Sequence, residues 1–190
     1  MSETSQELRL TLPTTAGARA SAKLEVGGND YFDMIGGTVT IELVNKSNPS
    51  YNQQTSLNIC RDGIRCIYLW LMGNNLEYAI WDEFTVTTTI EESVTYNATN
   101  HRWWRIRESA GITYIEVSTN GTSWNNFDNF SNIFDMSLAE IRLSMHNSNG
   151  AVAGSSTARF DNFSFDRAAR YTGIGGSGGG GGGGGSSDSF

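Results

Sequence analysis

Apolar and polar residues alternate in short runs along most of the chain, with a repeat of two. Examples are ELRLTL, GTVTIELV, IRCIYLWLM, ITYIEVS and EIRLSMH. Such a repeat places successive side chains on opposite faces of a β-strand. Turn-forming pairs rich in Gly, Asn, Asp and Pro separate the runs. The pattern therefore predicts an all-β fold, an antiparallel sandwich of two sheets, with at most one helical turn near residues 134–137.

Strand parity also predicts which side chains form the core. In each run the apolar set lies on one face, and the other face is polar or aromatic. In the last run, ARFDNFSF, the parity changes after Phe160, and a bulge at Asp161-Asn162 would bring the apolar residues to a single face. The predicted core residues are Leu8, Leu10, Leu12, Val39, Ile41, Leu43, Ile67, Leu69, Leu71, Trp104, Ile106, Ile115, Val117, Ile141, Leu143 and Met145.

The segment from His101 to Trp124 predicts a β-meander. Its runs RWWRIRE and ITYIEVS are joined by a turn at Ala110-Gly111, and Asn120-Gly121 is a strong signal for a two-residue hairpin. Rings and planar polar groups alternate with the predicted core residues, and together they suit the C–H faces and hydroxyls of sugars. We place the candidate carbohydrate-binding residues on the outward face of one sheet: Tyr68, Trp70, Trp103, Arg105, Arg107, Tyr114 and Glu116.

The same residues have a plainer interpretation. Arg105 and Glu116 would form a cross-strand ion pair that keeps the sheet soluble. Trp103 and Tyr68 would pack against a covering loop or a neighbouring subunit. The sequence does not decide between the two interpretations.

Composition narrows the range of partners. Of the 190 residues 38% are hydrophobic, which suits one core, and the formal net charge is −7. This charge argues against nucleic acid, because phosphates require clustered Lys and Arg. No apolar run reaches the length of a membrane span, so we expect no membrane insertion. The opening MSETSQELRL lacks the basic start and apolar core of a signal peptide.

The two cysteines, Cys60 and Cys66, flank a turn marked by Arg61-Asp62-Gly63. They would face each other across a short hairpin, where a disulfide forms if their positions are directly opposite. The alternative is two free thiols at neighbouring strand ends. The sequence leaves both open.

The end of the chain has a different composition. Residues 173–187 read GIGGSGGGGGGGGSS, which offers no side chains for a core. We therefore divide the chain into a sandwich domain, residues 5–170, and a flexible Gly/Ser-rich tail, residues 171–190.

The stretch HRWWRIRESAGITYIEVSTNGTSW, followed later by AEIRLSMHNSNGAVAGSSTARFDNFSF, resembles the C-terminal half of concanavalin A-like lectin/glucanase domains. The shared pattern comprises a strand with Trp104 and Arg105, a hairpin strand, the turn ending at Trp124, and a closing strand of the form A-R-F-D-x-F. The resemblance implies a jelly-roll sandwich in which Trp124 plugs the hairpin into the core. Such domains occur in phage minor tail and capsid decoration proteins.

Enzymes of this superfamily related to laminarinase carry E-x-D-x-x-E or E-x-D-x-E, which places two carboxyls side by side on one strand face. This chain has no such motif, and Asp82 and Glu83 would lie on opposite faces. We therefore expect a protein that is not an enzyme. The superfamily often holds a structural Ca²⁺, for which Asp30, Asp33 and Asp161 are candidates, although Asp also simply initiates turns. No other cofactor is expected.

These observations favour a non-enzymatic phage virion protein that displays its carbohydrate-binding face to a host-surface glycan. The alternative is a purely structural capsid decoration or tail-assembly protein that contacts other virion proteins. In both cases we expect synthesis in a host cytoplasm without a signal peptide, and a homo-oligomer or many copies on the virion.

Overall fold

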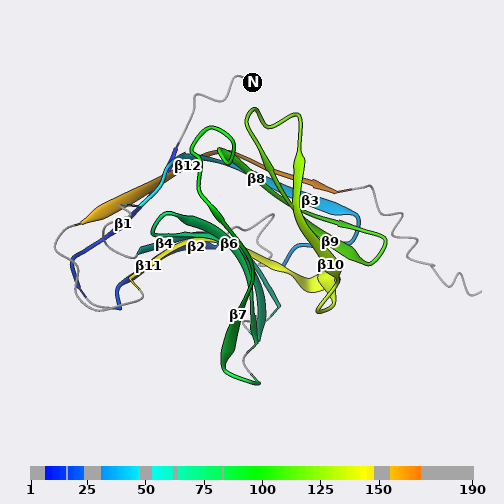
Figure 1. Ribbon diagram of the computed structural model, residues 1–190. Coiled ribbons are helices and arrows are strands. Elements are labelled where there is room, and N and C mark those ends of the chain that lie inside the picture. Colours follow the sequence, from blue (N-terminus) through cyan, green and yellow to red (C-terminus); the bar gives the residue numbers. More distant parts are fainter. Residues whose placement is uncertain are drawn as a thin grey trace, which may run out of the picture.

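The computed structural model describes residues 7–15, 17–23, 31–47, 53–61, 64–82, 84–147 and 155–167. Within these residues the chain forms two antiparallel six-stranded sheets that face each other (Figure 1). Sheet A has the strand order β1(Leu8–Leu12), β12(Ser156–Arg167), β3(Gly37–Asn45), β8(Trp103–Ser109), β9(Ile112–Ser118), β10(Asn125–Ser131). Sheet B has the order β2(Arg19–Lys23), β11(Glu140–Asn147), β4(Gln53–Arg61), β5(Arg65–Met72), β6(Asn75–Asp82), β7(Thr87–Thr95).

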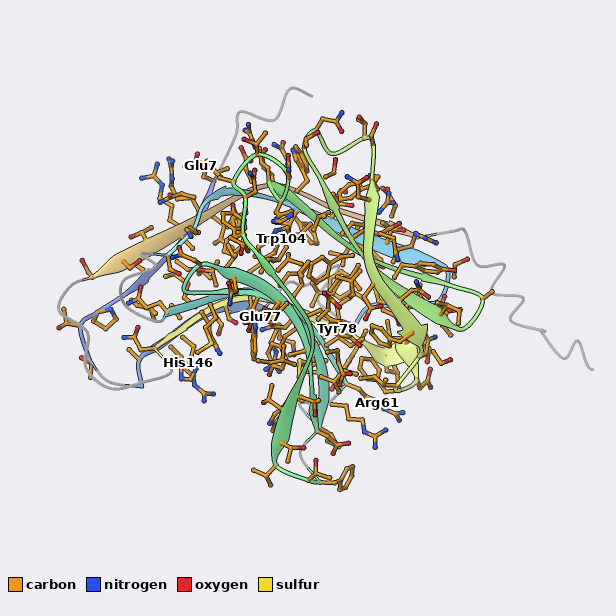
Figure 2. The ribbon with its side chains drawn as sticks, viewed as in Figure 1. Glu7, Arg61, Glu77, Tyr78, Trp104 and His146 are labelled. Carbon is orange, nitrogen blue, oxygen red and sulfur yellow. A yellow bond between two sulfur atoms is a disulfide. The ribbon has the colours of Figure 1, made fainter. Side chains whose placement is uncertain are left out.

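The predicted all-β sandwich is confirmed, and its core follows strand parity. Alternate residues of the facing strands are fully buried between the sheets, as predicted for Ile41, Ile67, Trp104 and Ile141. Figure 2 shows Trp104 and Tyr78 directed into the space between the sheets. Tyr78 on β6 stacks on Phe130 of β10, with ring centroids 4.8 Å apart. This contact joins sheet B to sheet A.

Two local predictions are confirmed. A short 3-10 helix spans Met136–Leu138, where one helical turn was expected. The register of β12 against β3 shifts between Asp161 and Ser164, so the bulge lies where the parity changed. The bulge returns Phe165 to the core, where it packs edge-on against Phe32, but Phe163 stays 38% exposed.

The turn after β9 differs from the prediction. The connection runs from residue 119 to residue 124, so it is longer than a two-residue hairpin. The Ser118 hydroxyl accepts hydrogen bonds from Asn120 N and Gly121 N. Gly121 has a φ of +74°, and an added Cβ would lie 2.9 Å from the ring of Trp103. The turn therefore folds back onto Trp103, and only glycine fits there.

Trp124 at the end of this turn also departs from the expectation. Its ring is half-buried, and the Arg105 guanidinium lies 4.1 Å above the ring centroid on the outer face of sheet A. The expectation that Trp124 plugs into the core was therefore wrong. The predicted tail, residues 171–190, lies outside the described residues.

Candidate functional site

Sheet B is curved, and its outer face is hollowed into a groove. Figure 1 shows β7 turned downward from the plane of β2, β11 and β4. The groove has a volume of about 500 Å³, and its lining residues come from all six strands of the sheet. This volume lies in the range of roughly 300–1,000 Å³ that is usual for ligand sites. The groove therefore runs across the strands.

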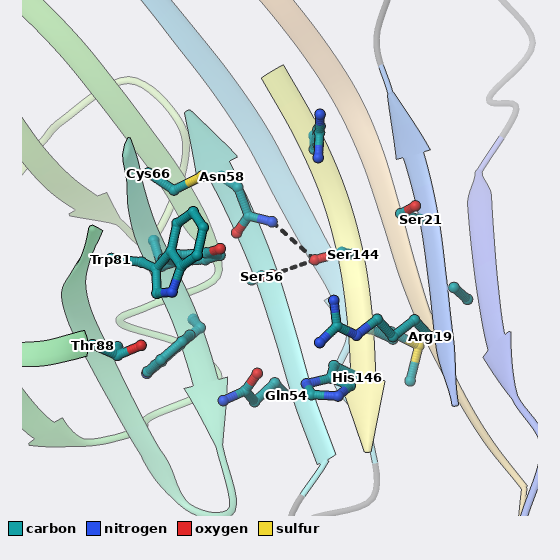
Figure 3. Close-up of a pocket in the computed structure, with 15 residues that line it drawn as sticks. Arg19, Ser21, Gln54, Ser56, Asn58, Cys66, Trp81, Thr88, Ser144 and His146 are labelled. Atoms are coloured by element: carbon teal, nitrogen blue, oxygen red, sulfur yellow. Dashed lines mark hydrogen bonds between the residues drawn. The ribbon is translucent and has the colours of Figure 1, made fainter. Parts of the chain in front are cut away.

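Cross-strand register brings three polar residues together at one end of the groove. His146 on β11 lies opposite Arg19 on β2 and also opposite Gln54 on β4. Directly opposite residues in antiparallel strands have Cβ atoms about 5 Å apart. Figure 3 shows the Arg19 side chain reaching from β2 over β11, with His146 and Gln54 beside it. Residues far apart in the chain thus form one cluster.

The floor of the groove is polar. The Ser144 hydroxyl on β11 accepts from Asn58 Nδ2 at 2.9 Å and lies 2.7 Å from the hydroxyl of Ser56 (Figure 3). Asn58 is 5% exposed, and its Oδ1 has no hydrogen-bond partner within the part of the chain that the structure describes. A buried acceptor without a donor is costly, and a ligand hydroxyl could satisfy it. Gln53 and Asn147, outside the groove lining, also have buried polar atoms without a partner among the described residues.

Aromatic rings occupy the middle and the other end of the groove. Tyr68 and Trp70 on β5 have ring centroids 5.3 Å apart. Trp70 Nε1 donates to a Glu77 carboxylate oxygen at 2.8 Å, which fixes the orientation of the indole. Trp81 on β6 lies opposite Cys66 on β5 and is half-buried.

The disulfide left open by the sequence is present in the structure. Cys60 on β4 and Cys66 on β5 are directly opposite in register and joined by a disulfide. Cys66 lines the groove below the aromatic end. The bond therefore ties together the two strands that carry Asn58 and Tyr68.

The charge of the groove is opposite to that of the chain. Its lining includes Arg19, Arg142 and His146 and no Asp or Glu, although the whole chain has a net charge of −7. Arg142 pairs with Glu140 further along the same strand face. Arg19 is exposed, and the structure records no ion pair for it among the described residues. An exposed cation in a concave site favours an anionic ligand.

Two titratable groups of the groove are shifted. Burial lowers the pKa of His146 below the usual value for histidine, and the neighbouring positive charge of Arg19 lowers it further. Burial raises the pKa of Tyr68, although Arg142 and Arg19 act in the opposite direction. At neutral pH His146 is therefore a neutral imidazole and Tyr68 a protonated phenol.

The outer face of sheet A carries the other predicted residues. Arg105 Nε donates to Glu116 Oε2 at 2.6 Å, and Arg107 Nε donates to the same oxygen at 3.3 Å. Arg107 also lies 3.9 Å above the ring centroid of Tyr114. Glu116 is only 7% exposed. Arg105 and Arg107 thus each already have a carboxylate and a ring as partners.

Burial alone would raise the pKa of Glu116. Hydrogen bonds and charges from Arg105 and Arg107 outweigh burial, so the pKa of Glu116 is lowered. This carboxylate is ionised throughout the neutral range and holds both guanidinium groups in place. The geometry matches the plainer interpretation, a cross-strand ion pair.

The predicted carbohydrate face is thus divided between two sheets. Tyr68 and Trp70 lie on the outer face of sheet B, whereas Trp103, Arg105, Arg107, Tyr114 and Glu116 belong to sheet A. The prediction that all seven share one sheet was wrong, because β5 pairs with β4 and β6 and has no neighbour in sheet A. Sequence reasoning missed the polar groove residues Arg19, Gln54, Asn58, Arg142 and His146. The alternation in EIRLSMH, which places Arg142, Ser144 and His146 on one face, was the available signal.

Two of the three calcium candidates, Asp33 and Asp161, belong to the described residues. Asp30 lies outside the described residues. Asp33 Oδ1 accepts from Ile35 N before β3, and Asp161 Oδ1 accepts from Asn162 N at the bulge of β12. Within the described ranges no three His, Cys, Asp or Glu side chains gather as a metal site would require. The structural Ca²⁺ stays a prediction.

Comparisons with known proteins identify the fold. No family model matches the chain, and no curated protein matches it. Among solved structures, alginate lyase A1-II′, a member of polysaccharide lyase family 7, has a TM-score of 0.56 at 13% identity, over 87% of this chain and 84% of the lyase. SCLam, a non-specific endo-β-1,3(4)-glucanase of family GH16, has a TM-score of 0.52 at 10% identity, over 80% of this chain and 63% of that enzyme.

These structures share the jelly-roll sandwich of the concanavalin A-like kind, as the resemblance implied, and at such identities they establish the fold alone. The expected function, display of a carbohydrate-binding face on a phage virion, is contradicted, because these matches are a polysaccharide lyase and a glucanase. A carbohydrate-binding module from the Dit protein of Lactobacillus casei BL23 phage J-1 has a TM-score of only 0.47 at 5% identity, too low to support a phage context.

Several expectations stay predictions. They are the absence of enzymatic activity, the absence of a cofactor, the virion location and the homo-oligomer. Within the described part of the chain, no helix is both long and apolar enough to cross a membrane.

Proposed function

We propose that this protein acts on an acidic polysaccharide, which it binds in the groove on the outer face of sheet B. The observation that carries the proposal is the charge reversal: the groove has Arg19, Arg142 and His146 in its lining in an acidic chain. Aromatic rings beside these cations suit the C–H faces of sugars. Guanidinium groups bind carboxylates through paired hydrogen bonds.

The same groove lacks what a retaining glycosidase requires. Such enzymes place two carboxyls about 5 Å apart on either side of the scissile bond. No carboxyl lines the groove. The two acids that flank it already have partners: Glu77 accepts from Trp70 and Ser93, and Glu140 pairs with Lys23 and Arg142. Hydrolysis by paired acids is therefore disfavoured here.

The groove suits β-elimination instead. In this reaction a base removes the proton next to the carboxyl group of a uronate, a carbon–carbon double bond forms, and the bond to the leaving sugar oxygen breaks. Neutral His146 is the base in our proposal, because its lowered pKa leaves a free nitrogen lone pair at neutral pH. The imidazolium of His146 that forms then returns this proton to the leaving oxygen, because the register places Tyr68 two strands across from His146 and level with Arg142. No further reactant is required.

Two other residues complete the arrangement. Arg19 lies opposite His146, where its guanidinium would neutralise the uronate carboxylate and so make the neighbouring proton more acidic. Gln54 lies opposite His146 on the other side, and its amide would donate to the same carboxylate. The family 7 lyase with the same fold acts, by its name, on alginate, which is an acidic polysaccharide.

The test is incubation of the protein with alginate, polygalacturonate, hyaluronan and a neutral β-glucan. Binding is measured by isothermal titration calorimetry, and cleavage by the ultraviolet absorbance of the unsaturated uronate. We expect at least one acidic polymer to bind and to be cleaved, and the β-glucan to do neither. Arg19→Gln should weaken binding of the acidic polymer, whereas Arg9→Gln, an exposed arginine on β1 of sheet A, should not. Binding of the neutral glucan alone would contradict the proposal.

A further inference from the structure

The groove of sheet B is chemically uneven along its length. Because its lining comes from all six strands, a chain lying in it crosses β2, β11, β4, β5 and β6 in turn. Figure 3 shows Arg19 on one side and Trp81 on the other, with Ser56, Asn58 and Ser144 between them. One polysaccharide would therefore meet different chemistry at different sugars.

All the cationic lining residues lie at one end. Arg19 comes from β2, and Arg142 and His146 come from β11, which are adjacent strands. Arg19 also influences the titration of both His146 and Tyr68, so its charge is directed toward the groove. This end of the groove can therefore bind the carboxylate of one acidic sugar.

The other end provides for an uncharged ring. The lining residues of β5, β6 and β7 are Cys66, Tyr68, Trp70, Trp81 and Thr88, with no Lys, Arg or His among them. Glu77, 7% exposed, lies on the same face of β6 and holds the indole of Trp70. A second carboxylate placed over these rings would lose water, gain no cation and be repelled by Glu77.

The two ends are too far apart for one sugar. The order of strands places β11 and β6 three strands apart, about 14 Å at a spacing of about 4.8 Å. The register places Trp81 level with Glu140, which precedes His146 by six residues on β11, or about 20 Å along the strand. His146 and Trp81 are therefore about 25 Å apart. Sugars several positions apart in one chain would therefore occupy the two ends at once. The serine and asparagine side chains between them suit the hydroxyls of the connecting sugars.

We infer that the groove selects a polysaccharide that carries both acidic and neutral sugars in one chain, with an acidic sugar at Arg19 and His146 and a neutral sugar on Trp81. This inference rests on the proposed function and names the substrate class more closely. A polymer with a carboxylate on every sugar would place one at the aromatic end. A fully neutral polymer would leave Arg19 without its anion.

The experiment varies the charge of one polymer while keeping its linkage. Oligosaccharides of alginate and of polygalacturonate, matched in length, have their carboxyl groups reduced to hydroxyls in increasing fractions. Calorimetric titration then gives the affinity of the full-length chain for each fraction. We expect affinity to pass through a maximum at partial reduction, about tenfold above both the unreduced and the fully reduced ends in at least one series.

Variants locate the preference. Trp81→Ala should remove the maximum, so that affinity falls steadily as carboxylates are lost. Trp124→Ala, a half-buried tryptophan on sheet A, is the matched control and should leave the maximum in place. Thermal melts of both variants confirm that each is folded before it is titrated.

The possible failures are distinguishable. If affinity falls steadily with each lost carboxylate in the unsubstituted protein, the mixed-sugar inference is wrong while the proposed function stands. If no member of either series binds and hyaluronan does not bind either, the proposed function fails with it. A maximum that survives Trp81→Ala also overturns the inference, because the neutral sugar then lies elsewhere.

Discussion

The outer faces of the two sheets use the same residue types for different purposes. On sheet A, Arg105 and Arg107 share the carboxylate of Glu116 and lie over the rings of Trp124 and Tyr114. On sheet B, Arg19 is exposed beside His146, and a groove of about 500 Å³ opens over the rings. On sheet A, the turn at Gly121 also covers the ring of Trp103.

The comparison shows that arginines and aromatic rings do not by themselves make a binding surface. On sheet A, Arg105 and Arg107 already have Glu116 as their anion, so a ligand would have to displace Glu116 and leave a buried charge without a partner. On sheet B, Arg19 has no such anion among the described residues, and the surface around it is concave. We therefore expect a ligand to bind where a charged side chain has no partner and the surface is concave, and not wherever arginines and aromatic rings occur together.

The largest expected effect is a loss of cleavage rate on substitution of His146, but not of His101, the other histidine of the chain. His146→Gln removes the neutral imidazole from the groove and should lower the rate of cleavage of the acidic polymer by about 100-fold or more. His101→Gln is the matched control: His101 lies in the β7–β8 connection, where its Nδ1 accepts from Asn97 N. Rates come from ultraviolet absorbance under saturating polymer. Equal losses in both variants would remove His146 from the mechanism.

The next effect is on stability and belongs to sheet A. Glu116→Gln leaves Arg105 and Arg107 without their carboxylate, and a broken buried pair costs several kcal/mol. Because the two arginine side chains are 19% and 30% exposed, water offsets part of this cost, and we expect a loss of about 2 kcal/mol. Urea denaturation measures the loss. Affinity for the acidic polymer should be unchanged; a parallel loss of affinity would show that sheet A takes part in binding.

A smaller effect is expected from Arg19 on sheet B, which has no ion pair among the described residues. Arg19→Gln should weaken binding of the acidic polymer about tenfold, equivalent to about 1.4 kcal/mol, without lowering the melting temperature. Arg105→Gln should do the opposite, lowering the melting temperature and leaving the affinity unchanged. Added salt should reduce the difference between Arg19→Gln and the unsubstituted protein, because salt screens an exposed charge. An affinity that does not respond to Arg19→Gln at low salt would contradict the groove assignment.

The smallest effect is a pH dependence. The pKa of Glu116 is lowered in the folded protein, so its contribution to stability is present above the unfolded value, about 4.5, and is lost as pH falls through the lower folded value. The stability difference between the unsubstituted protein and Glu116→Gln should therefore be constant at neutral pH and shrink as the pH falls below about 4.5. Denaturation curves at a series of acidic pH values measure it. A difference that grows as pH falls would contradict the direction of the shift.

Much of the fold could be predicted from alternation because each strand carries its own parity. Ile67, Trp104 and Ile141 are buried where the repeat of two placed them, and the bulge after Asp161 lies where the parity changed. The turn at Asn120-Gly121 was predicted too short, because the Ser118 hydroxyl and the ring of Trp103 support a longer loop. Local pattern does not report such contacts.

The site was predicted poorly because it depends on strand order. Arg19, Gln54 and His146 come together only because β11 pairs with both β2 and β4. The sequence showed that Tyr68 and Trp103 face outward, but not that they belong to different sheets. Whether an arginine is satisfied also depends on its cross-strand neighbour, as Glu116 shows for Arg105.

The five tryptophans of the chain test the central claim most directly. Trp70 and Trp81 lie on the outer face of sheet B, Trp103 and Trp124 on that of sheet A, and Trp104 in the core. Their indole N–H signals can be followed by ¹H–¹⁵N NMR while an acidic oligosaccharide is added, after assignment by single Trp→Phe variants. We predict that the signals of Trp70 and Trp81 shift with ligand and that those of Trp103 and Trp124 do not. Shifts confined to Trp103 and Trp124 would contradict the account.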